Sequence, residues 1–265
     1  MTDKAQPASI ASNASVPAAY SPERREDALR RINRRAFTWR WLRDWAESVI
    51  IAVAVWLVVR AFFVETYRIP TGSMERTLLV GDRLLVNKLA FGPDLPFTAR
   101  RLPGLEHPHR GDIVVFRWPV DKRINFIKRI VGVPGDTLSM VAGLLSVNGV
   151  QQSEPYAVHQ TAIADLVEDE AHFGWQRQYA VHGAAVAAVT HVSRNNWGPL
   201  VVPKQSYFVL GDNRDNSDDS RYWGFVPAML IEGRPILVAY SFAPDSAGSG
   251  LLTRVRWNRI GERVE

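Results

Sequence analysis

The pattern of apolar and polar residues in the first 64 residues differs from the pattern in the rest of the chain. Residues 27–45 are rich in arginine with tryptophans near their end, and they predict a basic helix. Residues 48–64 are mostly apolar and Arg60 is their only charge, so they predict one transmembrane helix. The uncharged part, 48–59, is shorter than the usual span of about 20 residues, so a buried helix or a signal-peptide core stays an alternative.

After residue 64 the chain shows short segments that are typical of strands. Branched and aromatic residues gather in four runs separated by turn signals: 82–89, 112–118, 124–133 and 206–210. Residues 144–147 are followed by Asn148-Gly149 and Val150, which predicts a hairpin with a tight primed turn. No helix-length periodic run interrupts this part, so we expect a mainly β fold. Residues 153–196 have no clear pattern, and we interpret them as an insertion with strands of its own.

Composition and charge restrict the classes of function. A chain of 265 residues, 46% hydrophobic and 22% charged, can bury one good core or two small ones. The net charge of +5 permits a nucleic-acid partner, but many arginines precede the apolar run: Arg24, Arg25, Arg30, Arg31, Arg34, Arg35, Arg40 and Arg43. We interpret them as a membrane-orientation signal and expect no nucleic-acid partner. The absence of cysteine excludes disulfides, thiolate nucleophiles and cysteine zinc sites.

The arginines also predict a topology. Residues 1–23 are rich in Ala, Ser and Pro and do not predict a fold of their own. Because basic flanks stay in the cytoplasm, the whole segment 1–47 is expected to be a basic cytoplasmic tail. Everything after residue 64 is then expected outside the cytoplasm.

Lys128 is the first candidate for chemistry, because it lies on a strand face that it shares with Ile124, Phe126 and Ile130. A lysine on such a face either extends its amine to water or loses its hydration. Desolvation disfavours the ammonium form and lowers the pKa, which would make Lys128 a general base near neutral pH. For a lone lysine, a surface position with the methylenes over apolar neighbours is the simpler interpretation.

Ser73 is the hydroxyl that such a base could activate. It lies just after the apolar run, in Ile69-Pro70-Thr71-Gly72-Ser73-Met74. Pro70 and Gly72 favour a tight, irregular backbone that could expose Ser73 Oγ and direct N–H groups at an oxyanion. Thr71 adds a second hydroxyl donor. Taken alone, the motif predicts only a turn.

Four segments in this order resemble the sequence boxes of one enzyme family. They are 69–74 with Thr77-Leu78, 110–116, 127–136 and 211–224. In that order they resemble the nucleophile box, the strand before the base, the lysine box and the C-terminal box of bacterial type I signal peptidases, also called leader peptidases. The matches extend from the apolar run to about Pro227. The tail and the insertion at 153–196 lie outside them.

The resemblance implies a membrane-anchored serine endopeptidase that removes N-terminal signal peptides from exported precursors with a Ser-Lys dyad. Ser73 would attack the scissile carbonyl, and Lys128 would accept its proton and return it to the leaving amine. The Ser73 N–H and the Thr71 hydroxyl would form the oxyanion hole. Family members commonly carry serine at the Thr71 position. Threonine keeps the hydroxyl, but its branched Cβ fixes that hydroxyl more stiffly.

The resemblance also assigns supporting residues. Ser217 would orient the lysine amine, and Asp219 with Arg221 would form an ion pair beneath the site. The simpler interpretation of this segment is a loop of self-capping Asp and Asn residues, in which Asp212, Arg214 and Asp218 are mainly structural. No cofactor or metal is implied.

The family's architecture implies the domain organisation. An antiparallel β catalytic core is expected at 65–138 and 198–265, with a smaller inserted β domain at 139–197 and one transmembrane helix at 48–64. The expected location is the bacterial inner membrane, single-pass, with the catalytic part on the periplasmic side. The expected partners are signal-peptide-bearing precursors and the lipid bilayer.

Other classes of protein fit less of the sequence. A Ser-His-Asp hydrolase would place Ser73 in a G-x-S-x-G elbow, which is absent. A penicillin-binding site would need lysine at position 76, where the chain has Arg76. His107-Pro108-His109 offers two zinc ligands without a recognisable third, and no helix-turn-helix of a self-cleaving repressor is found. The non-enzyme alternative is a membrane-tethered β domain that binds peptides, in which Ser73 and Lys128 would be dispensable.

Overall fold

The computed structural model describes residues 26–27, 39–95, 98, 100–159, 173–181, 192–243 and 254–265. Three predicted segments fall wholly or partly outside these residues: the tail 1–23, most of the basic helix 27–45 and much of the insertion 153–196. The chain divides into two units, 1–56 and 57–265, and each is described by itself.

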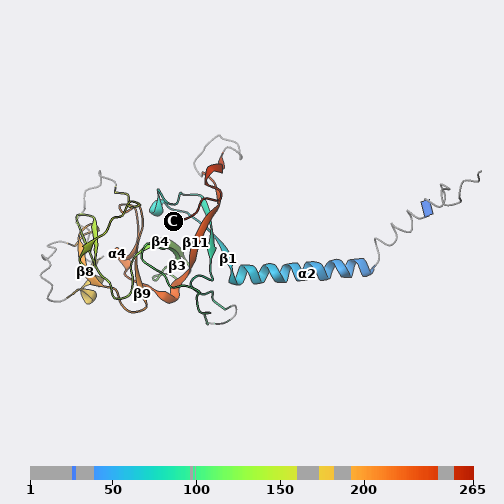
Figure 1. Ribbon diagram of the computed structural model, residues 1–265, viewed down its shortest axis with the longest axis horizontal. Helices are drawn as coiled ribbons and strands as arrows, with labels where there is room; N and C mark the ends of the chain where they lie inside the picture. The colour runs from blue at the N-terminus through green and yellow to red at the C-terminus, as the bar shows by residue number, and fades with distance from the viewer. Residues whose placement is uncertain are drawn as a thin grey trace, which may run out of the picture. The chain divides into compact units, whose positions relative to one another are not determined.

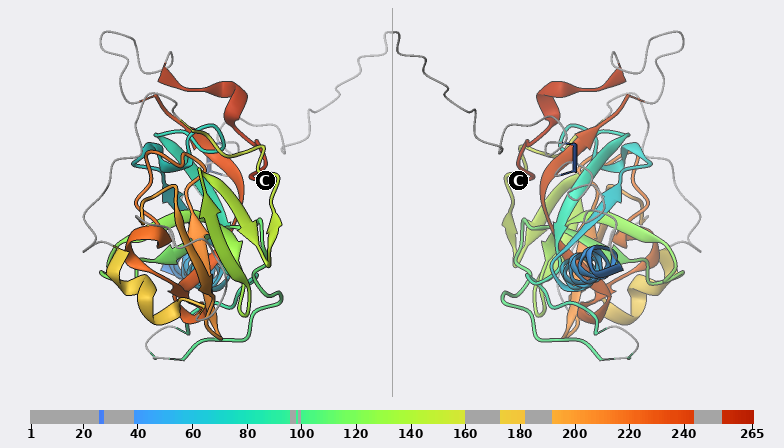
Figure 2. Two further views of the ribbon diagram at one scale, coloured as in Figure 1. Left: turned by 90° about the vertical axis from the view of Figure 1, so that its left-hand side faces the viewer. Right: turned by 90° about the vertical axis from the view of Figure 1, so that its right-hand side faces the viewer.

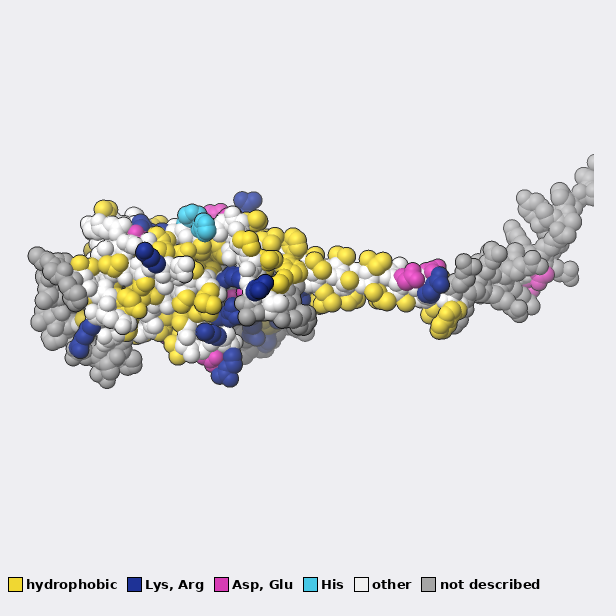
Figure 3. Space-filling view, turned by 90° about the horizontal axis from the view of Figure 1, so that it is seen from below, with side chains coloured by type: hydrophobic (Ala, Val, Ile, Leu, Met, Phe, Trp, Pro, Cys, Tyr) yellow, Lys and Arg dark blue, Asp and Glu magenta, His cyan; other side chains and the backbone are white. Residues whose placement is uncertain are grey.

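Helix α2 extends from Trp39 to Phe62 and includes most of the predicted apolar run. Its large apolar side chains are exposed along its length, with Ile50 65% and Ile51 64% exposed, and Figure 3 shows them in yellow on its surface. Within the described ranges, no helix is both long and apolar enough to cross a membrane. The transmembrane helix predicted at 48–64 is therefore not confirmed, and Val64 already belongs to a strand.

The larger sheet has seven strands, and every pairing in it is antiparallel. In sheet order they are β1 Val64–Arg68, β2 Asp82–Asn87, β11 Ile231–Ser241, β3 Ile113–Arg117, β4 Asn125–Gly132, β9 Ser206–Leu210 and β10 Val226–Pro227. Four of these strands lie where the sequence predicts strands, and the mainly β, antiparallel fold is confirmed. Figure 1 shows β3, β4 and β11 at the centre of this unit.

A second sheet has four strands in the order β7-β6-β5-β8. They are β5 Thr137–Val141, β6 Leu144–Val147, β7 Val150–Gln151 and β8 Trp197–Val201. Asn148 and Gly149, between β6 and β7, have φ of 52° and 80°, so the predicted primed turn is confirmed. Figure 1 shows β8 and β1 at opposite ends of the unit. The domain boundaries expected at 139 and 197 stay a prediction.

Strand β4 explains how a continuous apolar run can carry a lysine and an arginine. Its residues from Lys128 to Gly132 are all buried, because both faces of the strand are covered. Ile130 packs in one hydrophobic cluster with Phe126, whereas Val131 packs in a second cluster on the other face. Lys128 therefore lies on the Phe126–Ile130 face, as the alternation predicts.

The last described segment, 254–265, pairs with the C-terminal part of β11, beyond the residues that pair with β3. Val238 N–H donates to Glu262 O at 2.8 Å, and Gly261 N–H donates to Val238 O at 2.8 Å. The Arg259 guanidinium is bound to Asp82, which is fully buried at the start of β2. Both views of Figure 2 show this segment, in red, at the upper side of the unit.

Candidate active site

Ser73 lies in the turn that joins β1 to β2. Pairing of the two strands ends at Ile69, whose N–H donates to Asp82 O at 2.9 Å, and the following Pro70 has no N–H to continue it. Gly72–Met74 form one 3₁₀ turn. The Met74 side chain is 2% exposed and packs in a core cluster, so the turn is anchored beside Ser73. Ser73 itself is only 7% exposed.

Lys128 Nζ is hydrogen-bonded to Ser73 Oγ at 2.6 Å. The lysine side chain is buried, and this desolvation lowers the pKa of its amine to about 8. The carboxylates of Asp219 and Asp218 act in the opposite direction, and the cation of Arg221 again lowers the pKa. A substantial fraction of the amine is therefore neutral near pH 8, as a proton acceptor must be.

The loop that begins at Gly211 supports the Ser73 turn from behind. Asn213 N–H donates to Ser73 O at 3.1 Å, and Asn213 Nδ2 donates to Gly72 O at 3.3 Å. A Cβ on Gly211 would lie 2.2 Å from Ser217 Oγ and 2.5 Å from Ser73 O. Only glycine lets these three segments approach so closely.

Asp219 and Arg221 form a two-pronged ion pair that is completely buried. Arg221 Nε and Nη2 donate to Asp219 Oδ1 and Oδ2 at 2.8 and 2.9 Å. Burial alone would raise the pKa of Asp219, but Arg221 and the Gly211 N–H hold it below its usual value. Asp219 is thus a fixed negative charge close to Lys128, and it also caps the short helix α4, Ser220–Trp223.

The positions of two predicted site residues, Ser217 and Thr71, do not by themselves assign their roles. Ser217 is buried beside Gly211, but within the described part of the chain its hydroxyl makes no hydrogen bond to Lys128 Nζ. Thr71 is exposed and extended, and it lines the same groove as Ser73. The structure thus places Thr71 in the groove and Ser217 beside Gly211, and the roles expected of these two stay predictions.

A groove of about 510 Å³ contains Ser73 and Lys128. One wall is formed by 67–71 and the other by 124–128, and Asn216 and Asp218 complete the lining. Each wall follows a strand edge without a partner among the described residues: β1 pairs only with β2, and β4 pairs with β9 only from Arg129 onward. The groove can therefore accept an extended peptide between two free edges.

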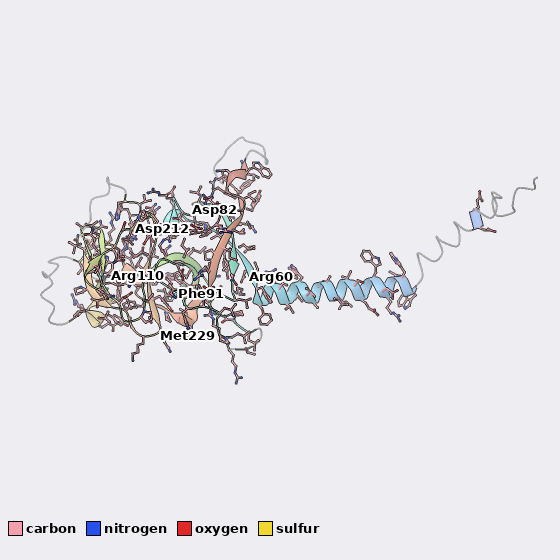
Figure 4. All side chains as sticks on the ribbon, viewed as in Figure 1. Arg60, Asp82, Phe91, Arg110, Asp212 and Met229 are labelled. Carbon is pink, nitrogen blue, oxygen red and sulfur yellow. The ribbon has the colours of Figure 1, made fainter. Side chains whose placement is uncertain are left out.

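The sequence did not reveal two ion pairs behind the site. Arg129, next to Lys128, donates two hydrogen bonds of 2.9 Å to Asp212, which also accepts from Thr77 Oγ1 at 2.6 Å. Figure 4 labels Asp212 in the interior of this unit. Arg214 is paired with Glu154, a residue of the insertion 153–196. The Asp-rich loop signalled polar contacts, but nothing in the sequence signalled these partners.

The positions of the described histidines bear on the alternative chemistries. The described groove lining contains no histidine, so a Ser-His-Asp arrangement is not formed around Ser73. His109 is instead near Asp112, with Nδ1 3.8 Å from its carboxylate. Among the residues that the structure describes, no three His, Cys, Asp or Glu side chains are grouped to hold a metal ion.

The groove can accept a peptide beside a serine and a lysine in contact, and comparisons with known proteins identify the family of the chain. The family profile described as "Signal peptidase, peptidase S26" matches residues 42–240, more than half of the chain. The chain therefore belongs to the peptidase S26 family of signal peptidases and is an enzyme of the type I signal peptidase class.

Individual relatives carry the same description. The chain is 34% identical to a Signal peptidase I of Buchnera aphidicola, over 83% of this chain and 81% of the relative. It is 35% identical to a Signal peptidase I of Pseudomonas aeruginosa, over 83% of this chain and 78% of the relative. A crystal structure of a signal peptidase I from Enterococcus faecalis is 31% identical and matches 49% of this chain and 98% of that chain with a TM-score of 0.33.

Proposed function

We propose that this enzyme removes N-terminal signal peptides from exported precursor proteins, with Ser73 as nucleophile and Lys128 as general base. The observation that carries the proposal is the 2.6 Å contact between Lys128 Nζ and Ser73 Oγ in a groove with two free strand edges. The lowered pKa of Lys128 supports it, because an ordinary lysine would be almost fully protonated at neutral pH.

The reaction has two proton-coupled steps. Neutral Lys128 accepts the Ser73 hydroxyl proton as Oγ bonds to the scissile carbonyl carbon, and the resulting ammonium donates that proton to the amine as the C–N bond breaks. Water then attacks the acyl ester of Ser73. Lys128 accepts a proton from this water and returns it to Oγ when the ester bond breaks, which restores both residues.

The charge that develops on the substrate carbonyl oxygen needs donors. The Ser73 N–H and the Thr71 hydroxyl are the proposed oxyanion hole, since both belong to the turn that lines the groove. Ser217 and the Asp219–Arg221 ion pair are the proposed supporting residues. The buried ion pair fixes the electrostatic environment of Lys128.

The substrate is proposed to bind as an extended strand between the two free edges, so that alternate side chains face the enzyme. Ile69, Pro70, Phe126 and Ile127 give the groove apolar walls. Shallow apolar pockets exclude bulk sterically, which favours small residues at the first and third positions before the bond, an Ala-x-Ala pattern. Replacing either alanine by leucine is expected to reduce kcat/KM at least about tenfold, whereas the intervening residue tolerates change.

The proposal includes association with the bacterial inner membrane through α2. Leaving the exposed apolar side chains along the 24 residues of α2 in water would cost free energy. The orientation follows from the arginines that precede the apolar run, with 1–47 cytoplasmic and the catalytic part periplasmic.

The test is cleavage of a secretory precursor by the detergent-solubilised full chain. Ser73→Ala is expected to abolish cleavage with an unchanged melting temperature, because it removes one oxygen from a turn anchored by its neighbours. If the variant still cleaves the precursor, Ser73 is not the nucleophile. If the wild-type chain binds the precursor and never cleaves it, the peptide-binding alternative is correct.

A further inference from the structure

Residues 154–158 of the insertion pair with the loop behind the active site. Val158 N–H donates to Asp212 O at 2.7 Å, and Arg214 N–H donates to Val158 O at 2.9 Å. A turn closed by Ala157 N–H to Glu154 O, at 3.0 Å, brings the preceding residues against the same loop. This segment belongs to none of the sequence boxes, yet it is joined to the loop that supports Ser73.

Glu154 and Arg214 form the strongest contact between the two segments. Arg214 Nη1 and Nη2 donate to the two carboxylate oxygens of Glu154 at 2.8 and 2.7 Å, and only 1% of the Arg214 side chain is exposed. Arg214 Nε also donates to Gly211 O at 3.2 Å. Because arginine stays charged in proteins, its burial requires this carboxylate. The guanidinium therefore fixes the Gly211 backbone only while Glu154 is in place.

Tyr156 adds a second link to the same loop. The Arg129 guanidinium lies 4.0 Å from the centre of the Tyr156 ring, and Tyr156 Oη donates to Glu154 Oε1 at 3.0 Å. Arg129 is itself bound to Asp212. The insertion thus contacts two buried arginines that are bound to the loop, Arg129 and Arg214.

The other side of this loop touches the reacting residues. Gly211 leaves room for Ser217 and for the Ser73 carbonyl, and Asn213 donates to that carbonyl. The Arg214 carbonyl accepts a hydrogen bond from Arg221 Nη2 at 2.7 Å. A displacement of the loop would therefore shift both the Ser73 turn and the Asp219–Arg221 pair, and each of these contacts the dyad or lies close to it.

We propose that Glu154 is a positioning residue, which holds the 211–214 loop against the Ser73 turn and keeps water away from the Lys128 amine. The inserted part of the chain is then required for the reactivity of the dyad, although it lies outside the groove. This inference rests on the proposed function of Ser73 and Lys128.

The test is Glu154→Gln in the full detergent-solubilised chain, because glutamine keeps the shape and removes the charge. We expect kcat to fall at least about tenfold with KM within about twofold, since Glu154 does not line the groove. We also expect the acidic limb of the pH profile of kcat/KM to move upward by about half a unit or more, because a hydrated Lys128 regains basicity. The charged groups that face Lys128, namely Asp219, Asp218, Arg221 and Asp212, are unchanged in this variant.

A matched control is Glu106→Gln. Glu106 binds Arg234 Nη1 at 2.6 Å on a more exposed part of the surface, so the same substitution there should leave kcat and the pH profile unchanged. A double variant, Glu154→Gln with Arg214→Met, separates positioning from folding. It removes both buried charges, so it should melt near the wild-type temperature while kcat stays low and the pH profile stays shifted.

The outcomes are distinguishable. Recovery of wild-type kcat and pH profile in the double variant would show that Glu154 only neutralises Arg214, and would overturn the inference. Wild-type kinetics of Glu154→Gln, with Ser73→Ala inactive in the same assay, would overturn the inference alone. An active Ser73→Ala would instead overturn the proposed function, and the positioning role with it.

Discussion

Burial gives Lys128 its properties at the scale of single residues. The same chemical group on the surface would be a solvated ammonium, whereas here its amine lies 2.6 Å from a serine hydroxyl inside the protein. Burying this amine lowers the free energy of unfolding, and the loss should be measurable. It gives the first prediction.

Lys128→Met should be inactive and more stable than the wild type at neutral pH. Below pH 8 the amine is protonated in both the folded and the unfolded state, and lowering its pKa from 10.5 to about 8 destabilises the fold by roughly 3 kcal/mol. The penalty declines as the pH rises from about 8 to 10.5. Denaturant melts at several pH values should therefore show a gain for the variant that shrinks across this range.

The control for this measurement is Lys204→Met, on the exposed surface. It should change neither cleavage nor the pH dependence of stability. A Lys128→Met chain that loses stability at pH 7, or that still cleaves the precursor, would contradict the assignment of a desolvated base.

Gly211→Ala is the second prediction at this scale. The added Cβ would meet the Ser73 carbonyl at 2.5 Å, and a backbone atom cannot rotate away. We expect a loss of about 2 kcal/mol in the free energy of unfolding and a large loss of kcat. Gly174→Ala is the matched control, because nothing lies within 4 Å of its Cβ position, and its thermal melt and activity should match the wild type.

Candidate site residues could be predicted from the sequence where a sequence motif contains them. They could not be predicted where they depend on contacts that only the tertiary structure forms. Ser73 and Lys128 stood in recognisable segments, and the structure places them in contact. Glu154 and Arg129 were missed because their partners are distant in sequence. No local pattern specifies which buried arginine a distant carboxylate will meet.

At the scale of elements, runs of branched and aromatic residues bounded by turn signals predicted four strands of the larger sheet, β2, β3, β4 and β9. Strand β11 was not predicted, since Gly233 and Pro235 interrupt its sequence and two register shifts break the period against β2. Gly233 is required there: its Cβ would lie 2.5 Å from Asn87 O. Strand β1 was not predicted, because its first residue, Val64, was assigned to the apolar helix and the remaining four, Glu65–Arg68, include two charged residues.

The third prediction concerns the C-terminal segment at 254–265. Asp82 is fully buried and accepts hydrogen bonds from Arg259, Ser241 and the Leu79 N–H. Arg259→Met would leave this carboxylate with less compensation, so we expect a loss of about 3 kcal/mol in the free energy of unfolding. Chemical denaturation would measure it. Figure 4 labels Asp82 within the unit that should be destabilised.

Arg263→Met serves as the comparison, because Arg263 is exposed in the same segment. Its free energy of unfolding should stay within about 0.5 kcal/mol of the wild type. Equal effects of the two substitutions would mean that the segment is held by its backbone pairing with β11 and not by Asp82.

The fourth prediction belongs to the whole molecule and concerns topology. Protease added to intact spheroplasts should digest the catalytic part and spare the tail at 1–47, because the arginines before the apolar run retain it in the cytoplasm. Immunoblots against tags at the two ends would measure this. Digestion of the tail with protection of the catalytic part would reverse the proposed orientation, and permeabilised cells should show digestion of both.

Two strand edges of the groove have no partner among the described residues, and for the proposed function this has a consequence for the timing of cleavage. A peptide can complete the sheet only if its own backbone is free of other partners, so residues already folded into a helix or hairpin cannot enter. The enzyme would then select its substrates by their folding state as well as by their sequence. A passenger that folds tightly up to its first residue should stay uncut, and a short unstructured spacer should restore processing.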